Sequence, residues 1–89
     1  MAVKTLKIVN EKGLHARASA KFVEVVEAHE ARANVSKDGM TVSGDSIMGL
    51  LMLAASRGTS IEVETSGDEA EPLAEALEKL VANRFGEDF

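Results

Sequence analysis

Residues 60–65, Ser-Ile-Glu-Val-Glu-Thr, carry the clearest indication of the fold. Apolar and polar side chains alternate along it, which predicts a β-strand that buries Ile61, Val63 and Thr65 on one face. Half-buried alternating strands are typical of antiparallel or mixed sheets with one open face. The rest of the chain should therefore supply partner strands, and helices that cover the buried face.

The first half of the chain predicts three further strands, at residues 3–9, 33–37 and 40–43. In the first of these, Leu6 and Ile8 share one face, and the loop of residues 10–13 follows. The other two flank Asp38-Gly39, a dipeptide that supplies the positive φ angles of a tight hairpin turn. These segments complete a sheet of four short strands.

Three helices are predicted, over residues 16–31, over residues 47–54, and from a start between residues 68 and 72 to an end near Gly86. The first carries an apolar stripe with Lys21, Glu24 and Glu27 on its solvated face, and the stripe comprises Ala18, Phe22, Val25, Val26 and His29. His29, close to the end of this helix, is expected to complete the stripe or to cap the helix. The third helix buries residues at i, i+4, i+7 and i+8, namely Leu73, Leu77, Leu80 and Val81. Residues 87–89 are expected to fray.

The second helix should begin after Ser46, whose hydroxyl can accept an unpaired backbone N–H, and should be closed by Arg57-Gly58. Leu50, Leu53 and Ala54 share the side that faces the core. The opposite side is also apolar, and it is formed by Ile47, Met48, Leu51 and Met52. This side is either a surface for protein partners, for which methionine is well suited, or part of a helix buried all round.

The resulting order, β-α-β-β-α-β-α, predicts an α+β fold in one domain spanning residues 1–89. A chain of 89 residues and 9.4 kDa is too short for two cores. Cysteine is absent, so a thiolate metal site and a catalytic cysteine are excluded, and with two histidines no metal site or cofactor is expected. The longest apolar run, residues 47–55, is too short to span a membrane, and the first residues resemble no signal peptide, so a cytoplasmic location is expected.

Charge is distributed unevenly along the chain. The net charge is −5, and there are three Phe and no Trp or Tyr, which argues against nucleic acid as a partner. Residues 1–60 carry eight Lys or Arg against six Asp or Glu, whereas residues 61–89 carry two against nine. The first part is therefore available for binding anions.

The residues that best indicate a chemical function are 13–17, Gly-Leu-His-Ala-Arg, where a loop meets the first helix. With His15 as N-cap, the N–H groups of Ala16, Arg17 and Ala18 have no intrahelical acceptor, and the helix dipole disfavours a protonated ring. A helix N-terminus also favours a bound phosphate, and the guanidinium of Arg17 can hold two of its oxygens. These features fit a histidine that accepts a phosphoryl group. Spacing alone leaves open a surface histidine that only caps the helix.

Two motifs together, residues 13–17 and residues 46–50 (Ser-Ile-Met-Gly-Leu), with Ser46 thirty-one positions after His15, resemble the HPr family. These proteins are phosphocarriers of the bacterial phosphoenolpyruvate-dependent phosphotransferase system, and the resemblance covers the whole chain. It implies an open-faced β-sandwich, a four-stranded antiparallel sheet with three helices on one face. It also implies that His15 takes a phosphoryl group on Nδ1 from phosphorylated enzyme I and passes it to an EIIA-type domain. Arg17 would stabilise the phosphate during transfer.

The same resemblance implies regulation and partners. Ser46 would be a target of an HPr kinase/phosphorylase, and the helix after it would be the docking surface for enzyme I. The family motif usually continues with proline where this chain has Ala18, which keeps a backbone donor and should leave anion binding intact. A monomer is expected, because His15 must meet two partners in turn. The sequence leaves open whether the carrier serves sugar transport or a nitrogen-linked regulatory branch.

Two other classes of protein compete with this interpretation. A non-carrier regulatory module of the same fold would have no need of the pair His15 and Arg17. An acyl carrier protein carries a phosphopantetheine arm on the serine of an Asp-Ser-Leu motif, and Asp45-Ser46-Ile47 is similar to that motif. That class is all-helical, and the predicted strand at residues 60–65 contradicts it.

Overall fold

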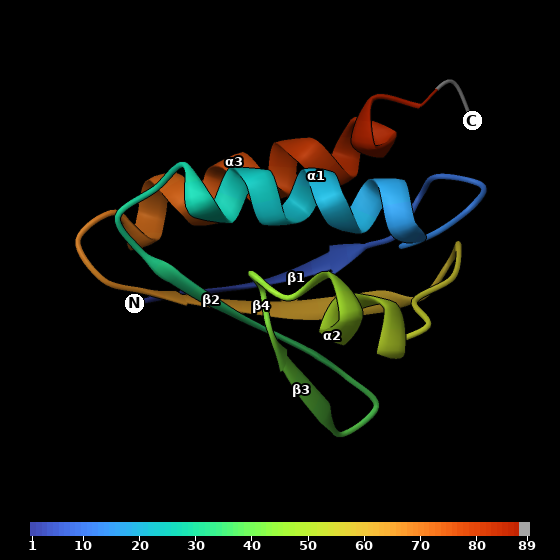
Figure 1. Ribbon diagram of the computed structural model, residues 1–89, viewed down its shortest axis with the longest axis horizontal. Helices are drawn as coiled ribbons and strands as arrows, with labels where there is room; N and C mark the ends of the chain where they lie inside the picture. Colours follow the sequence, from blue (N-terminus) through green and yellow to red (C-terminus); the bar gives the residue numbers. More distant parts are fainter. Residues whose placement is uncertain (88–89) are drawn as a thin grey trace.

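Four strands, three α-helices and one 3-10 turn follow one another along residues 1–87, the part of the chain that the computed structural model describes (Figure 1). The strands are β1 (Ala2–Lys7), β2 (Arg32–Lys37), β3 (Met40–Ser43) and β4 (Ser60–Ser66). The helices are α1 (Ala16–Glu27), α2 (Ile47–Met52) and α3 (Ala70–Ala82), and the 3-10 turn η1 spans Arg84–Gly86. The β-α-β-β-α-β-α order predicted from the sequence is confirmed.

The strands form one antiparallel sheet in the order β1-β4-β2-β3. Strand β4 therefore lies inside the sheet, between β1 and β2. Ile61, Val63 and Thr65 are all buried, and the intervening residues of β4 are exposed. One face of the sheet is thus apolar and the other is polar.

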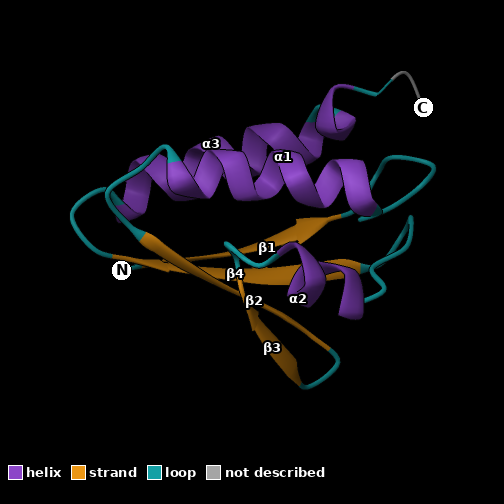
Figure 2. Ribbon diagram, in the orientation of Figure 1, coloured by secondary structure: helices purple, strands orange, loops and turns teal. Residues whose placement is uncertain are grey.

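The apolar face is covered by helices, and the polar face is open (Figure 2). Helices α1 and α3 lie side by side over the sheet, and the short α2 packs against α1 and β3. Phe22 of α1 and Leu73 and Leu77 of α3 belong to one hydrophobic core, and all three side chains are fully buried. The predicted four-stranded sheet with three helices on one face, an open-faced sandwich, is confirmed.

The ends of α1 and α2 differ from the predicted ends. Helix α1 stops at Glu27, not near residue 31, and Nδ1 of His29 donates to the Val25 carbonyl at 2.7 Å, so His29 caps the helix as expected. Helix α2 stops at Met52. Ala54, which the sequence places on the core side, is exposed with a left-handed φ of 50°. Gly58 does not close α2, because its N–H donates to the Ile8 carbonyl at the entry to β4.

The segment after α3 also departs from prediction. Helix α3 ends at Ala82, and the next residues form a left-handed turn with φ values of 55°, 55° and 79° at Arg84, Phe85 and Gly86. Phe85 is fully buried, and Lys21, predicted to face solvent, is half-buried and donates to the Phe85 carbonyl at 2.7 Å. Glu87, predicted to fray, is held against His15. Residues 88–89, included in the same prediction, lie outside the described residues.

Candidate functional site

His15 is the N-cap of α1, as the sequence predicts. Its backbone is extended (φ −83°, ψ −176°), and its carbonyl accepts the first bond of the helix from the Ser19 N–H at 2.8 Å. The side chain therefore stands beside the first turn, where N–H groups without intrahelical acceptors give the helix its partial positive charge. The His15 side chain is 28% exposed, which leaves it open to a partner from one side.

The two ring nitrogens of His15 have different partners. The backbone N–H of Arg17 donates to Nδ1 at 3.3 Å, which makes Nδ1 an acceptor with a lone pair. The proton of the neutral ring must then be on Nε2, which donates to Oε2 of Glu87. These two contacts favour the neutral tautomer that is protonated on Nε2, with Nδ1 directed at the helix N-terminus and Nε2 at a carboxylate.

Glu87 is itself held by a second group. Nδ2 of Asn10 donates to Oε1 of Glu87 at 3.0 Å, and the same Nδ2 donates to the Gly13 carbonyl at 2.8 Å. Burial raises the pKa of Glu87, but hydrogen bonds from Asn10 and His15 and the attraction of the nearby His15 and Lys12 side chains outweigh it. The net effect lowers the pKa of Glu87 below its ordinary value of 4.5. Glu87 is therefore a carboxylate at neutral pH.

The loop before His15 is fixed by close backbone contact with the segment after α2. Gly13 adopts a φ of 67°, and a Cβ atom there would lie 2.5 Å from the Ala55 carbonyl oxygen. The same oxygen accepts the N–H of Leu14 at 2.8 Å. The loop that contains the first motif, residues 13–17, is therefore in backbone contact with Ala55. Ala55 lies just after α2, the helix that contains most of the second motif, residues 46–50.

The remaining residues predicted at the anion site occupy different surroundings. Ala16 and Arg17 are exposed, and Arg17 forms no ion pair with any carboxylate among residues 1–87. Ala18 is completely buried and packs in the core under the first turn. The structure thus leaves the guanidinium of Arg17 available to an anion at the helix N-terminus, while Ala18 lies below the surface.

Ser46 is the N-cap of α2, and its hydroxyl accepts the Gly49 N–H at 3.0 Å. On this short helix, Leu50 is fully buried, whereas Met48 is 71% and Met52 64% exposed. Ile47 is also exposed and Leu51 is half-buried. We call these four residues, Ile47, Met48, Leu51 and Met52, the apolar patch. The patch is open to solvent, so the helix is not buried all round.

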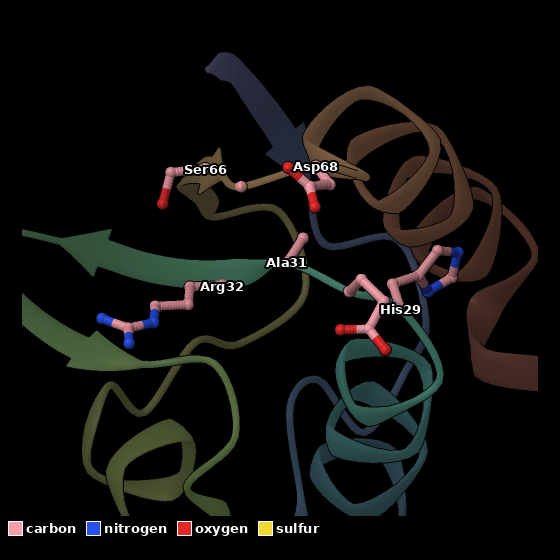
Figure 3. A pocket seen from close by; sticks show the side chains of 7 residues that line it. His29, Ala31, Arg32, Ser66 and Asp68 are labelled. Carbon is pink, nitrogen blue, oxygen red and sulfur yellow. The ribbon is translucent and has the colours of Figure 1, made fainter.

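A cavity of about 530 Å³ lies at the other end of α1 from His15, between the α1–β2 and β4–α3 connections. His29, Arg32 and Asp68 line it, and their side chains point in different directions (Figure 3). These side chains do not converge on a common point as those of a catalytic centre would. No three His, Asp or Glu side chains within residues 1–87 are grouped to bind a metal ion. Nor does the described part of the chain contain a helix long and apolar enough to cross a membrane.

The residues on the Nε2 side of the His15 ring were not predicted from the sequence. Asn10 is fully buried although the sequence predicts a loop there, and Glu87 contacts His15 across 72 positions of sequence. An asparagine three positions before the glycine of a loop is a weak sequence signal for Asn10. No sequence signal indicates Glu87, because its position depends on the left-handed turn at Arg84 and Phe85.

Comparisons with known proteins agree with this architecture. A family model described as "PTS HPr component phosphorylation site" matches residues 2–83. Phosphocarrier protein HPr of Neisseria meningitidis is 48% identical over 88 residues, which cover 98% of each chain. Among solved structures, HPr-C-His from Thermoanaerobacter tengcongensis aligns with a TM-score of 0.95 at 36% identity over 100% of both chains. An HPr dimer from that organism aligns with a TM-score of 0.77 at 37% identity, over 98% of this chain and 100% of that one. The chain belongs to the HPr family, the phosphocarrier proteins of the phosphotransferase system.

Proposed function

We propose that the protein accepts a phosphoryl group from phosphorylated enzyme I on Nδ1 of His15 and passes it to an EIIA-type domain. The observation that supports this most directly is the state of Nδ1, which carries a lone pair beside the N-terminus of α1. A nucleophilic nitrogen and a site for its phosphate are thus present in one place.

In the proposed reaction the lone pair of Nδ1 attacks phosphorus. The bond between phosphorus and the donor breaks, and its electron pair leaves with the donor. The phosphate oxygens then lie at the first turn of α1, where the N–H groups of the exposed residues Ala16 and Arg17 favour negative charge. The N–H of Ala18, a fully buried residue, adds to the helix dipole. The guanidinium of Arg17, exposed and without an ion-pair partner among residues 1–87, binds two of the oxygens.

The apolar patch serves as the docking surface in this proposal. Contacts of a carrier with successive partners are small and short-lived, and flexible methionines adapt to more than one partner. Gly13 and Leu14 contact Ala55, so the segment after α2 adjoins the loop that carries His15. We expect the chain to act as a monomer, because the ring must face enzyme I and an EIIA-type domain in turn.

Ser46 is proposed as a regulatory phosphorylation site for an HPr kinase/phosphorylase. Its hydroxyl oxygen already accepts a backbone N–H of α2, and a phosphate at that position suits the dipole of the helix. About two negative charges would be added beside Ile47 and Met48. Phosphorylation of Ser46 is therefore expected to leave the fold intact and to repel an acidic partner.

Phosphoryl transfer from enzyme I and phosphoenolpyruvate tests the carrier function. The wild-type chain should gain one acid-labile phosphate, His15→Ala should gain none, and His29→Ala is the control that removes the other histidine. Arg17→Ala should slow the transfer about 10- to 100-fold, the effect of losing a hydrogen bond between charged groups. Rapid phosphorylation of the folded His15→Ala variant, or none of the wild type, would contradict the proposal and favour a non-carrier regulatory module.

A further inference from the structure

The chain after α3 continues to the end of the molecule at which α1 begins, and its last described residue, Glu87, contacts the ring of His15. We call residues 83–87 the strap. Its anchor is Phe85, which is fully buried, and its carbonyl is fixed by Nζ of Lys21 at 2.7 Å. In Figure 1 the strap and the loop between β1 and α1 lie at the same end of the molecule.

The strap has a backbone conformation that is unfavourable for its residues. Arg84 and Phe85 both have a φ of 55°, in the left-handed region, where side chains with a Cβ atom are strained. Two such residues in succession persist only where packing compensates them. Burial of Phe85 is the compensation, and the outcome of the turn is that the Glu87 carboxylate is directed at Nε2 of His15.

A second residue fixes the orientation of that carboxylate. Asn10 is fully buried, and its Nδ2 bridges the Gly13 carbonyl and Oε1 of Glu87. Oδ1 of Asn10 is buried without a partner among the described residues, so the amide is held in place by its donor side alone. Asn10 thus links the loop that carries His15 to the carboxylate that contacts the ring.

We propose that Glu87 is a positioning residue for phosphoryl transfer, which accepts the Nε2 proton of His15 and so keeps the lone pair on Nδ1. The inference rests on the proposed carrier function and adds a residue to it. The contact occupies Nε2 only, so the nitrogen beside the N-terminus of α1 remains open to the donor.

The same contact compensates the charge that forms during the reaction. When Nδ1 forms its bond to phosphorus, no proton leaves the ring, and the imidazole becomes cationic with its proton still on Nε2. A carboxylate that accepts that proton in a hydrogen bond stabilises the cation. When an acceptor attacks phosphorus, the electron pair of the N–P bond returns to Nδ1, and the neutral ring is restored in its starting tautomer.

The test compares the wild type with Glu87→Gln, which keeps the size of the side chain and removes its charge. Glu64→Gln is the matched control, because Glu64 is exposed on the open face of β4. Two quantities are measured: the single-turnover rate of transfer from phosphorylated enzyme I, and the tautomer of the unphosphorylated His15 ring by ¹⁵N NMR. Thermal unfolding reports whether each variant is folded.

Glu87→Gln should transfer about tenfold more slowly, the loss expected for one charge-assisted hydrogen bond. The fraction of neutral rings with the proton on Nδ1 should rise, and Glu64→Gln should match the wild type in both measurements. Glu87→Asp, which retains a carboxylate, should recover part of the rate.

A Glu87→Gln variant with the rate and the tautomer of the wild type would overturn the role of Glu87 and leave the carrier function standing. A faster variant would also overturn it, because Glu87 would then shield the ring. If the wild type itself gained no phosphate on His15, the carrier function would fall and the positioning role with it.

Discussion

At the scale of single residues, the chemistry of the site depends on which nitrogen of His15 holds the proton. Nδ1 accepts from the Arg17 N–H, and Nε2 contacts Glu87, so the backbone and one side chain act on opposite sides of the ring. The proposed nucleophile is thereby prepared before any partner binds, because the ring need not exchange its proton first.

Gly13→Ala tests the turn that holds His15 in place. The new Cβ would lie 2.5 Å from the Ala55 carbonyl oxygen, too close for any real contact, and the φ of 67° would be strained. Gly39→Ala is the control, since Gly39 also has a positive φ but has nothing within 4 Å of the position that a Cβ atom would take. Urea unfolding should show that Gly13→Ala costs about 1–3 kcal/mol more than Gly39→Ala. Equal losses would mean that the loop yields without cost.

Individual residues differ in how far the sequence could reveal them. The N-cap position of His15 follows from the start of an apolar helical stripe, and the structure confirms it. The pairing of Glu87 with the ring has no local cause, because it needs two left-handed residues and the burial of Phe85. Sequence patterns describe local structure and cannot show a contact made by a strained turn far along the chain.

At the scale of elements, α2 is the one that depends most on its surroundings. A helix of six residues is unstable alone, so it is held by its cap and its packing. Gly49 allows close approach to β3, because a Cβ there would lie 3.0 Å from Cβ of Val42. The hydroxyl of Ser46 caps the N-terminus of α2, the helix that carries the apolar patch.

Ser46→Ala should therefore lower the free energy of unfolding by about 1 kcal/mol, the usual cost of a lost N-cap. Ser46→Asp keeps an acceptor and places a negative charge at the helix N-terminus, so its stability should stay close to that of the wild type. Ser60→Ala, exposed on β4, is the control. Denaturant titration measures all three, and a stable Ser46→Ala would show that packing alone holds α2.

Elements were predicted more reliably in their interiors than at their ends. The alternation of β4 and the stripe of α1 reflect burial, which repeats along the element. The end of α2 at Met52 reflects instead the left-handed Ala54 and the contacts of the next segment, which place Ala55 in the core. Tertiary contacts set such boundaries, and local propensity does not encode them.

At the scale of the whole molecule, the proposed functions are gathered on one side of α1 and α2. The open face of the sheet is polar, and the acidic residues lie mainly in the last third of the sequence. The apolar patch adjoins the segment that touches the loop of His15. A partner that covers the patch would therefore approach the ring at the same time.

Met48→Glu tests this docking surface. A charge in place of the most exposed methionine of the patch should raise the KM of enzyme I for this carrier about tenfold. The transfer rate at saturating carrier should change little. Val3→Glu is the control, because Val3 is 55% exposed on β1, away from the patch. Steady-state phosphotransfer with varied carrier concentration measures both. An unchanged KM for Met48→Glu would place the docking surface elsewhere.

The central claim is that Nδ1 of His15 carries the phosphoryl group, and the most direct measurement is ¹⁵N and ³¹P NMR of the phosphorylated chain with labelled histidine. We expect one phosphate, coupled to Nδ1 of His15, with the proton retained on Nε2 beside Glu87. Phosphate on Nε2 of His15, or on another residue, would contradict it.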